Sequence, residues 1–307
     1  MSRILDVLEE IGMIPFVKIM SPYESEKIGK ILLRDSVPVI GVDFCSVTSV
    51  DAVTHLHKNV PDLLVGAVSV EGVDQTIQAI DSGAEFVLFS DFDEHAIAVC
   101  EKNGVLAVPF CKTPAQIRQA QILGLTAICN DFIGQEVVDA CNGVTKIFLT
   151  GETDLEKIGS LLNNTTCPTL AACGLIISQE KLQTNGIKDI MYQIFKFSFA
   201  HMGINCDNKD EARELINGIC RTFSLAFGEI TTSYFADFRI EASKWHLPGE
   251  KGHFAISTNS VFRAVRFLKG LGNEFLDDTK VYDNHGNLKG IFMAHQFGGF
   301  AVQICHN

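Results

Sequence analysis

Eight short apolar segments in the first 190 residues constrain the fold of this chain more than any other feature. Each is six to eight residues long, is rich in apolar and β-branched side chains, and shows no alternation of apolar and polar residues. Continuous apolarity of this kind is typical of parallel strands buried on both faces. We predict strands at IPFVKI (14–19), VPVIGVDF (37–44), LLVGAVSV (63–70), EFVLFS (85–90), VLAVPF (105–110), TAICND (126–131), KIFLTG (146–151) and TLAACG (169–174).

Helix-like segments separate these predicted strands. They include SVDAVTHLHKN (49–59), VDQTIQAIDSG (73–83) and PAQIRQAQILG (114–124). The second and third end in glycine, which favours a helix C-terminus, and the third opens with proline, which is favoured in a first helical turn. Eight strand–helix units in succession predict an α/β fold, a closed TIM-type (β/α)8 barrel over residues 1–192. An open, doubly wound sheet is the alternative, but the chain lacks the GxGxxG and Walker-type loops that often accompany it.

The balance of charged and apolar residues narrows the class of protein. Hydrophobic residues make up 47% of the chain and charged residues 20%, which favours buried cores over disorder. The net charge of -12 argues against nucleic acids and membranes as partners, because both select clustered Lys and Arg. The N-terminal sequence lacks the pattern of a signal peptide, and no apolar run approaches the roughly 20 residues that span a bilayer. The ten cysteines show no CxxC spacing, so we expect a cytoplasmic chain with reduced thiols.

The order of the apolar segments carries a family resemblance. VPVIGVDF, VGAVSV, GAEFVLFS, AVPFCKTP, FLTG and AACG together resemble the 2-keto-3-deoxy-6-phosphogluconate and 4-hydroxy-2-oxoglutarate (KDPG/KHG) aldolases over residues 3–190. This resemblance implies a class I aldolase, in which a lysine on the sixth strand forms a Schiff base with pyruvate. It also implies a carboxylate on the second strand for proton transfer, an arginine and glycine-rich backbone for a phosphate, and a trimeric assembly.

The residues that the resemblance places at these positions are unsuited to that chemistry. The lysine position falls on Cys129, the glutamate position on Gly41 and the arginine position on Cys45. A thiol cannot form an imine with a ketone as an amine does. The paired glycines after the seventh strand become Gly151 and Glu152, and a carboxylate there would occupy the place where helix N-terminal amides attract an anion. We therefore expect a degenerate aldolase-like barrel, a pseudoenzyme of the lyase family.

Two alternatives keep the barrel functional. Lys112, directly after the fifth strand, is a candidate for a relocated Schiff-base amine, with Asp43 or Asp131 as the general base, and Lys18 is a second candidate. An exposed loop lysine is the simpler interpretation of Lys112. Four cysteines near strand ends also allow a thiol-rich pocket for a soft metal or a redox event, although small buried apolar residues are the simpler explanation. These are Cys45, Cys111, Cys129 and Cys173.

The sequence pattern changes at Phe197. An alternating run, FSFAHMGINC, precedes a helix-like segment, KDEARELINGICRTF, and two strand-like runs, EITTSYF and FRIEASK. A second unit begins at GHFAIST, continues through VFRAVRFLKGLG and ends in strands near TKVYD, LKGIFMAH and GFAVQICH. This α+β arrangement of paired βαβββ-type repeats over residues 197–307 resembles the vicinal oxygen chelate superfamily, which includes glyoxalase I and extradiol dioxygenases.

The resemblance to this second superfamily implies one metal ligand on each of four strands. The matching positions are His201, Glu241, His253 and Gln303. Alternation along each strand places these side chains opposite the apolar residues that would face the helices. Two imidazoles and a carboxylate form a competent ligand set for Zn, Ni, Mn or Fe. Gln303 replaces the usual glutamate and is a weaker, neutral ligand that cannot act as a general base. The alternative is a polar cavity lining without a metal.

Three functional interpretations follow. The leading one is a degenerate KDPG/KHG aldolase-like protein whose remaining activity resides in the C-terminal metal site. The second is an active 2-oxo-acid lyase that uses Lys112, and the third is a non-catalytic metabolite-binding or regulatory protein. In each, the expected partners are a small molecule such as a 2-oxo acid and further copies of the chain in a homo-oligomer. No cofactor is expected in the barrel, and no nucleic acid or membrane is expected to bind.

Overall fold

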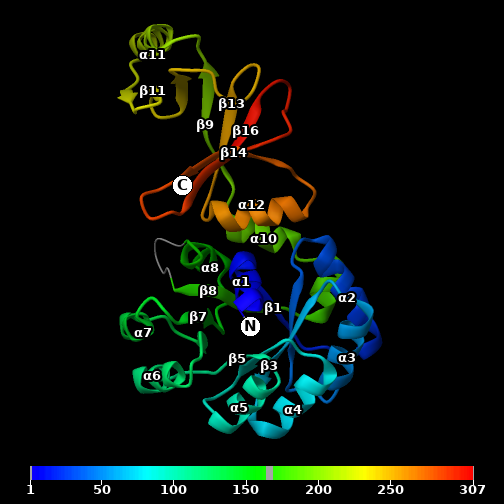
Figure 1. Ribbon diagram of the computed structural model, residues 1–307. Coiled ribbons are helices and arrows are strands. Elements are labelled where there is room, and N and C mark those ends of the chain that lie inside the picture. Colours follow the sequence, from blue (N-terminus) through cyan, green and yellow to red (C-terminus); the bar gives the residue numbers. More distant parts are fainter. Residues whose placement is uncertain (1, 164–168, 307) are drawn as a thin grey trace. The chain divides into compact units, whose positions relative to one another are not determined.

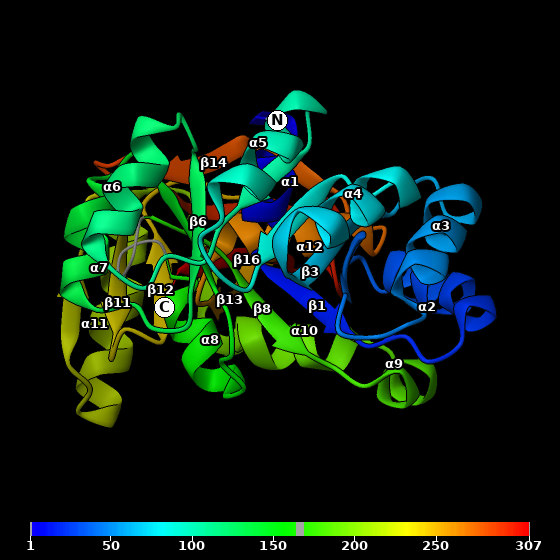
Figure 2. The same ribbon diagram turned by 90° about the horizontal axis from the view of Figure 1, so that it is seen from below.

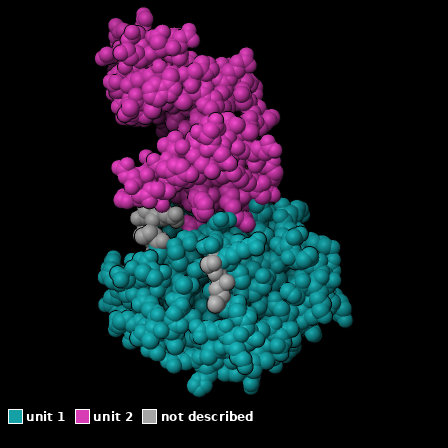
Figure 3. Space-filling model, viewed as in Figure 1, with its two compact units in different colours: residues 1–194 teal, residues 195–307 magenta. Residues whose placement is uncertain are grey.

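The chain forms two compact units, residues 1–194 and 195–307 (Figures 1 and 3). A computed structural model describes residues 2–163 and 169–306. The boundary between the units falls within α10 (Lys188–Phe195). Among the described residues, none of the helices combines the length and the apolar character needed to cross a membrane.

Unit 1 is built on eight parallel strands. They pair in the order β5-β4-β3-β2-β1-β8-β7-β6, so the first and last strands of the chain order lie next to each other at the middle of the sheet. The sheet is nearly closed, because the Cys111 N–H donates to the Cys129 carbonyl (3.0 Å) and the Cys129 N–H donates to the Pro109 carbonyl (2.9 Å). This confirms the α/β barrel that the eight apolar segments predict. The strands are β1 (Met13–Val17), β2 (Val39–Asp43), β3 (Leu64–Val70), β4 (Phe86–Phe89), β5 (Leu106–Val108), β6 (Ala127–Asn130), β7 (Lys146–Leu149) and β8 (Leu170–Ile176).

Helices surround these strands in unit 1 (Figures 1 and 2). Local sequence fixes several of their ends. The Asp93 carboxylate accepts from two backbone N–H groups at the start of α5, and Thr113 with Gln116 forms a capping box on α6. Gly83 ends α4 with a φ of 105°, a left-handed conformation that favours glycine. The helices are α1 (Ser2–Ile11), α2 (Pro22–Arg34), α3 (Ser49–Asn59), α4 (Gly72–Ser82), α5 (Glu94–Lys102), α6 (Pro114–Ile122), α7 (Gln135–Cys141), α8 (Leu155–Leu161), α9 (Gln179–Asn185) and α10.

The Phe16 ring fills the space beside two glycines on the strands that flank β1. A Cβ atom placed on Gly174 would come within 2.2 Å of this ring, and one placed on Gly41 would lie 3.0 Å from it and 2.6 Å from a methyl of Val68. Phe16 is 9% exposed. Aromatic and branched side chains therefore occupy the volume that side chains at positions 41 and 174 would need.

Unit 2 contains one sheet of eight strands in the order β10-β11-β12-β9-β13-β16-β15-β14. Two halves follow the same βαβββ order, and in each half the first and last strands pair in parallel: β9 with β12, and β13 with β16. The halves join through the antiparallel pair β9–β13. The elements are β9 (Ser198–Asn205), α11 (Lys209–Phe223), β10 (Phe227–Glu229), β11 (Ser233–Ala236), β12 (Ile240–Ser243), β13 (His253–Thr258), α12 (Val261–Gly270), β14 (Phe275–Tyr282), β15 (Leu288–Met293) and β16 (Ala301–His306).

The run EITTSYF, expected as one strand, forms parts of two. Ile230 and Ser233 exchange backbone hydrogen bonds across a tight turn, which separates β10 from β11. The first half therefore has the same three strands after its helix as the second half. Two β-branched threonines inside the turn made the run look continuous in sequence.

Each half of unit 2 has its own small core between its helix and one face of the sheet. In the first half, Ala212 and Ile216 of α11 pack with Ala242 of β12. In the second half, Val261 and Val265 of α12 pack with Ile304 of β16. Because successive strand residues alternate between faces, Glu241 and Gln303 point to the opposite face.

Replacing Phe16 with alanine tests the packing of the barrel. Loss of a buried aromatic ring leaves a cavity, so we expect the free energy of unfolding to fall by about 3–5 kcal/mol. Urea denaturation followed by circular dichroism measures this change. Phe132→Ala is the matched control, because Phe132 is 70% exposed and its loss should cost no more than about 0.5 kcal/mol. Equal effects of the two substitutions would contradict the packing role of Phe16.

Candidate functional site

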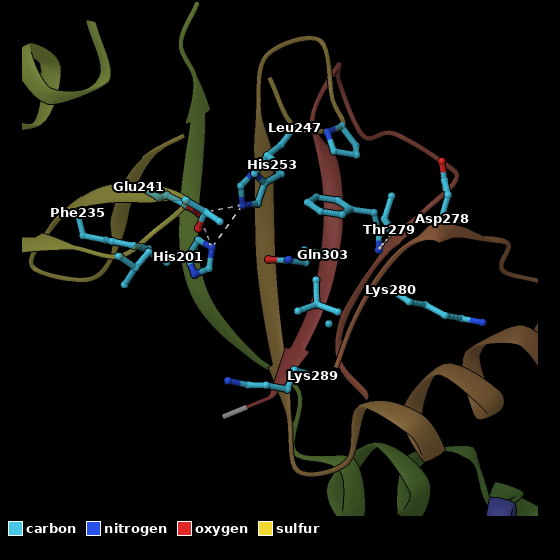
Figure 4. A pocket seen from close by; sticks show the side chains of 16 residues that line it. His201, Phe235, Glu241, Leu247, His253, Asp278, Thr279, Lys280, Lys289 and Gln303 are labelled. Carbon is cyan, nitrogen blue, oxygen red and sulfur yellow. Dashed lines mark hydrogen bonds and ion pairs between the residues drawn. The ribbon is translucent and has the colours of Figure 1, made fainter. Parts of the chain in front are cut away.

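Three side chains from adjacent strands of unit 2 converge on one point. His201 of β9 lies 2.9 Å from Glu241 of β12, measured from Nε2 to Oε2. His253 of β13 approaches the same Oε2 with its Nε2 at 3.2 Å, and the two imidazole Nε2 atoms are 3.3 Å apart. Figure 4 shows the three side chains directed toward one another. Among the described residues, this is the only group of three His, Cys, Asp or Glu side chains whose ligand atoms all lie within 4.8 Å of one another.

The spacing of these three atoms suits a single divalent metal ion. Nitrogen and oxygen ligands bind such ions at roughly 2.0–2.2 Å, so neighbouring ligands of one ion lie roughly 3.0–3.5 Å apart. The separations in this group, 2.9, 3.2 and 3.3 Å, are close to that range. Atoms with lone pairs lie this close when an N–H proton or a metal ion stands between them.

The register of three strands explains the convergence. Gly203 of β9 pairs with Glu241 on one side and with His253 on the other. A Cβ on Gly203 would lie only 1.9 Å from Cε1 of the His253 ring. The imidazole therefore rests against the backbone of β9, and only glycine leaves room for it.

Neighbouring side chains hold the three ligand candidates in place. The Ser233 hydroxyl donates to Oε1 of Glu241. The ring of Phe235 meets His201 edge-on at 5.9 Å between centroids, and that of Phe292 meets His253 edge-on at 5.3 Å. Within the part of the chain that the structure describes, the buried Nδ1 of His253 has no hydrogen-bond partner, so Nε2 and packing orient this ring. Sequence reasoning missed Gly203, Ser233 and these phenylalanines, since each depends on register across strands.

Electrostatics favour the charged form of Glu241. Burial raises the pKa of this carboxyl, but hydrogen bonds from His201, His253 and Ser233 outweigh burial and hold the pKa well below its usual range. Glu241 is 5% exposed, and His253 is fully buried. The site thus holds a buried negative charge between two imidazoles.

A cavity of about 520 Å³ opens beside the three residues, a size typical of sites for small molecules. Gln303 lines this cavity with them, and Figure 4 shows its amide between the three ligand candidates and β14. We call this space the unit 2 cavity. It brings together all four residues that the sequence predicts as metal ligands, although Gln303 makes no hydrogen bond to the other three.

In the barrel, the residues predicted for lyase chemistry do not converge on one point. Lys112 has a side chain that is 58% exposed, and its Nζ lies 3.6 Å from the Asp91 carboxylate rather than beside Asp43 or Asp131. The Asp43 carboxylate accepts from the Cys45 N–H at 3.2 Å, and Asp131 is exposed. Lys18 is exposed as well.

The four cysteines near the strand ends do not form a metal-binding group. Cys45 is exposed, whereas Cys111, Cys129 and Cys173 are buried. The Cys129 thiol donates to the carbonyls of Phe89 and Val108. Burial raises the pKa of Cys111 to about 12 and that of Cys129 well above its usual value. These thiols are therefore structural in the resting protein.

In the loop after β7, a carboxylate of the loop itself accepts hydrogen bonds from the loop's backbone N–H groups. Glu152 Oε1 accepts from the N–H groups of Thr153 and Asp154, both at 3.0 Å. Its other oxygen pairs with Lys157 at 2.5 Å. The amides that would attract an external anion here already have an internal partner.

Comparison with known proteins supports the barrel fold of unit 1. Residues 4–182, more than half of the chain, match the protein family described as KDPG and KHG aldolase. The chain belongs to the KDPG and KHG aldolase family. A 2-dehydro-3-deoxy-phosphogluconate aldolase of Treponema pallidum (strain Nichols) is 26% identical over 128 residues, 42% of this chain. That match spans 61% of the relative, less than two thirds of its length.

Two further relatives match a longer part of the barrel. A 2-dehydro-3-deoxy-phosphogluconate aldolase of Haemophilus influenzae is 24% identical over 198 residues, 62% of this chain and 92% of the relative. The crystal structure of the KDPG aldolase from Legionella pneumophila, which holds pyruvate as a covalent carbinolamine, has a TM-score of 0.51 and 17% identity. It covers 61% of this chain and 94% of its own. At this identity, the likeness shows the aldolase fold.

Thiol labelling tests the burial of the barrel cysteines. Under native conditions, iodoacetamide should modify Cys45 and leave Cys111, Cys129 and Cys173 unmodified, because burial blocks access to all three thiols. Burial also raises the pKa of Cys111 and of Cys129. Peptide mapping by mass spectrometry reads the pattern, and labelling in guanidinium chloride shows that every peptide can be detected. Modification of Cys129 at a rate similar to that of Cys45 would show an accessible, reactive thiol instead.

Proposed function

We propose that this member of the aldolase family has lost Schiff-base chemistry in its barrel and carries its activity in a divalent metal centre of unit 2. His201, Glu241 and His253 are the proposed ligands, with Gln303 as a fourth, weaker one. The observation that carries the proposal is the convergence of three ligand atoms within 3.3 Å of one another at the edge of a cavity. Zn, Ni, Mn and Fe all suit two imidazoles and a carboxylate.

The topology of unit 2 supports this proposal. Two βαβββ halves pair through their first strands, and each half contributes residues to one cavity from its first and last strands. This is the arrangement expected for the vicinal oxygen chelate superfamily, to which the sequence of residues 197–307 is similar. Unit 2 is accordingly proposed to be a glyoxalase-like domain.

The barrel supports the loss of aldolase chemistry in three ways. Cys129, at the position where the resemblance places the lysine, is buried and has no amine. The space beside Gly41, where the resemblance places a glutamate, is filled by Phe16 and Val68. Glu152 occupies the amides that a substrate phosphate would need. Nucleophile, proton-transfer group and anion site are thus each replaced.

The chemistry of the proposed centre follows from its residues. A bound divalent ion would act as a Lewis acid on a substrate oxygen. Glu241 supplies the one negative charge of the ligand set, and the Ser233 hydroxyl donates to its second oxygen. Gln303 has no basic atom, so it can orient a substrate oxygen but cannot remove a proton. The site therefore favours a reaction driven by polarisation of a carbonyl or enol oxygen.

A small 2-oxo acid or a related metabolite is the proposed ligand. The proposed assembly is a homo-oligomer, a trimer by analogy with the family.

Metal analysis tests the proposal directly. The purified protein, or the protein after incubation with Zn, Ni, Mn or Fe and desalting, should contain about one metal ion per chain. His201→Ala, Glu241→Ala and His253→Ala should each lose it, whereas His285→Ala, which removes an exposed histidine, should retain it. Ser233→Ala should weaken metal affinity about 10–100-fold, because it frees the carboxylate that Ser233 orients. Elemental mass spectrometry measures the metal content of each protein. A chain that takes up none of the four metals, or ligand variants that bind as well as the parent, would refute the metal centre.

Trapping with pyruvate and borohydride tests the loss of lyase chemistry. We expect no covalent adduct on the protein by intact mass, since the Lys112 ammonium is exposed and paired with Asp91 rather than desolvated. An active KDPG aldolase, labelled in parallel, controls for the reagents. An adduct that maps to Lys112 would instead establish a working lyase.

A further inference from the structure

Two irregularities in the strand pair β14–β15 alter the wall of the unit 2 cavity. Leu276 pairs with Phe292 and Val281 pairs with Gly290, so residues 277–280 of β14 bulge opposite the single residue Ile291. Val281 then pairs with Gly290 and Tyr282 with Leu288, which makes Lys289 an extra residue in β15. Bulges of this kind redirect side chains and are common beside functional sites.

The bulges place side chains from both strands in the cavity lining. Thr279 fixes the first bulge, because its hydroxyl donates to the Leu276 carbonyl at 2.6 Å and accepts from the Phe292 N–H at 3.0 Å. Lys280 and Lys289 both line the cavity. Without the bulge, Lys289 would alternate with Gly290 and share the face of Ile291, which packs in the core against α12.

The two lysines differ in their partners. The Lys280 ammonium pairs with the Asp277 carboxylate at 3.0 Å. Among the residues that the structure describes, no carboxylate lies within ion-pair distance of Lys289. Figure 4 shows Lys289 extending toward the half of the view that contains His201 and the Gln303 amide, whereas Lys280 extends away from it. Lys289 is thus the lysine available to a ligand in the cavity.

The charges that line the cavity also favour an anion once a metal is bound. Two carboxylates, Glu241 and Asp278, and two ammonium groups, Lys280 and Lys289, line it, so these four charges cancel. A divalent ion would make the lining cationic, although the whole chain carries a net charge of -12. Apolar side chains such as Phe235, Leu247 and Phe292 form much of the remaining lining. Lys289 itself is exposed, so its ammonium can meet a ligand without losing all of its hydration.

We propose that Lys289 is the anion-binding residue of the unit 2 cavity, and that the substrate is a dianionic metabolite. In this arrangement one end of the substrate, a 2-oxo acid or similar chelating group, faces the metal centre, and a second carboxylate at the other end pairs with Lys289. This inference rests on the proposed metal centre and specifies its substrate class.

Isothermal titration calorimetry of the metal-loaded protein tests the inference with matched probes. 2-Oxoglutarate and 2-oxoadipate carry a second carboxylate, whereas 2-oxovalerate and 2-oxohexanoate have carbon chains of the same lengths without it. We expect at least one of the dicarboxylates to bind about tenfold more tightly than its matched monocarboxylate, as one hydrogen-bonded charge pair predicts. Lys289→Met should reduce this preference to about twofold or less without changing the affinity for the monocarboxylates or the metal content.

Lys280→Met is the matched control, because it removes the same charge from the same lining and should leave most of the preference intact. A parent protein that loads metal but shows no preference for either dicarboxylate would overturn the role of Lys289. A preference for dicarboxylates that survives Lys289→Met would also overturn this role. A preference that Lys280→Met abolishes would do the same. Failure to load metal would refute the proposed metal centre itself, which distinguishes the two failures.

Discussion

The antiparallel contact between β9 and β13 is the interaction on which the candidate site depends. It joins the two halves of unit 2, and it sets His253 against Gly203 and beside His201. Neither half contains the full group, since His201 and Glu241 come from the first half and His253 from the second. A shift of one residue in this pairing would turn one histidine to the opposite face and separate the three atoms.

The space beside a glycine is filled by different kinds of side chain in the two units. In unit 2, Gly203 leaves space that a polar ring occupies, and this allows a buried charge to be surrounded by partners. In the barrel, the spaces at Gly41 and Gly174 are taken by the Phe16 ring. At Gly203 the close approach brings polar atoms together beside a cavity. At Gly41 and Gly174 it fills the space with apolar atoms.

Much of this architecture could be predicted from the sequence. Continuous apolar runs separated by helix-like segments predicted the barrel, because both signals are local. Alternation along each strand placed His201, Glu241 and His253 opposite the apolar residues of their strands. The split of EITTSYF into β10 and β11 was missed, since threonines favour strands whether or not a turn interrupts them. Gly203, Ser233 and Lys289 were missed for a different reason: their roles arise from pairing between strands distant in sequence, which a single sequence does not specify.

The packing of Phe16 limits which substitutions the barrel can accept. A lysine placed at position 129 would add an amine to a barrel in which position 41 has no room for a carboxylate. Room for a carboxylate at position 41 would require smaller side chains at positions 16 and 68, because Phe16 and Val68 fill that space. Phe16 and Val68 thus decide which side chains position 41 can accept, whatever residue stands at position 129.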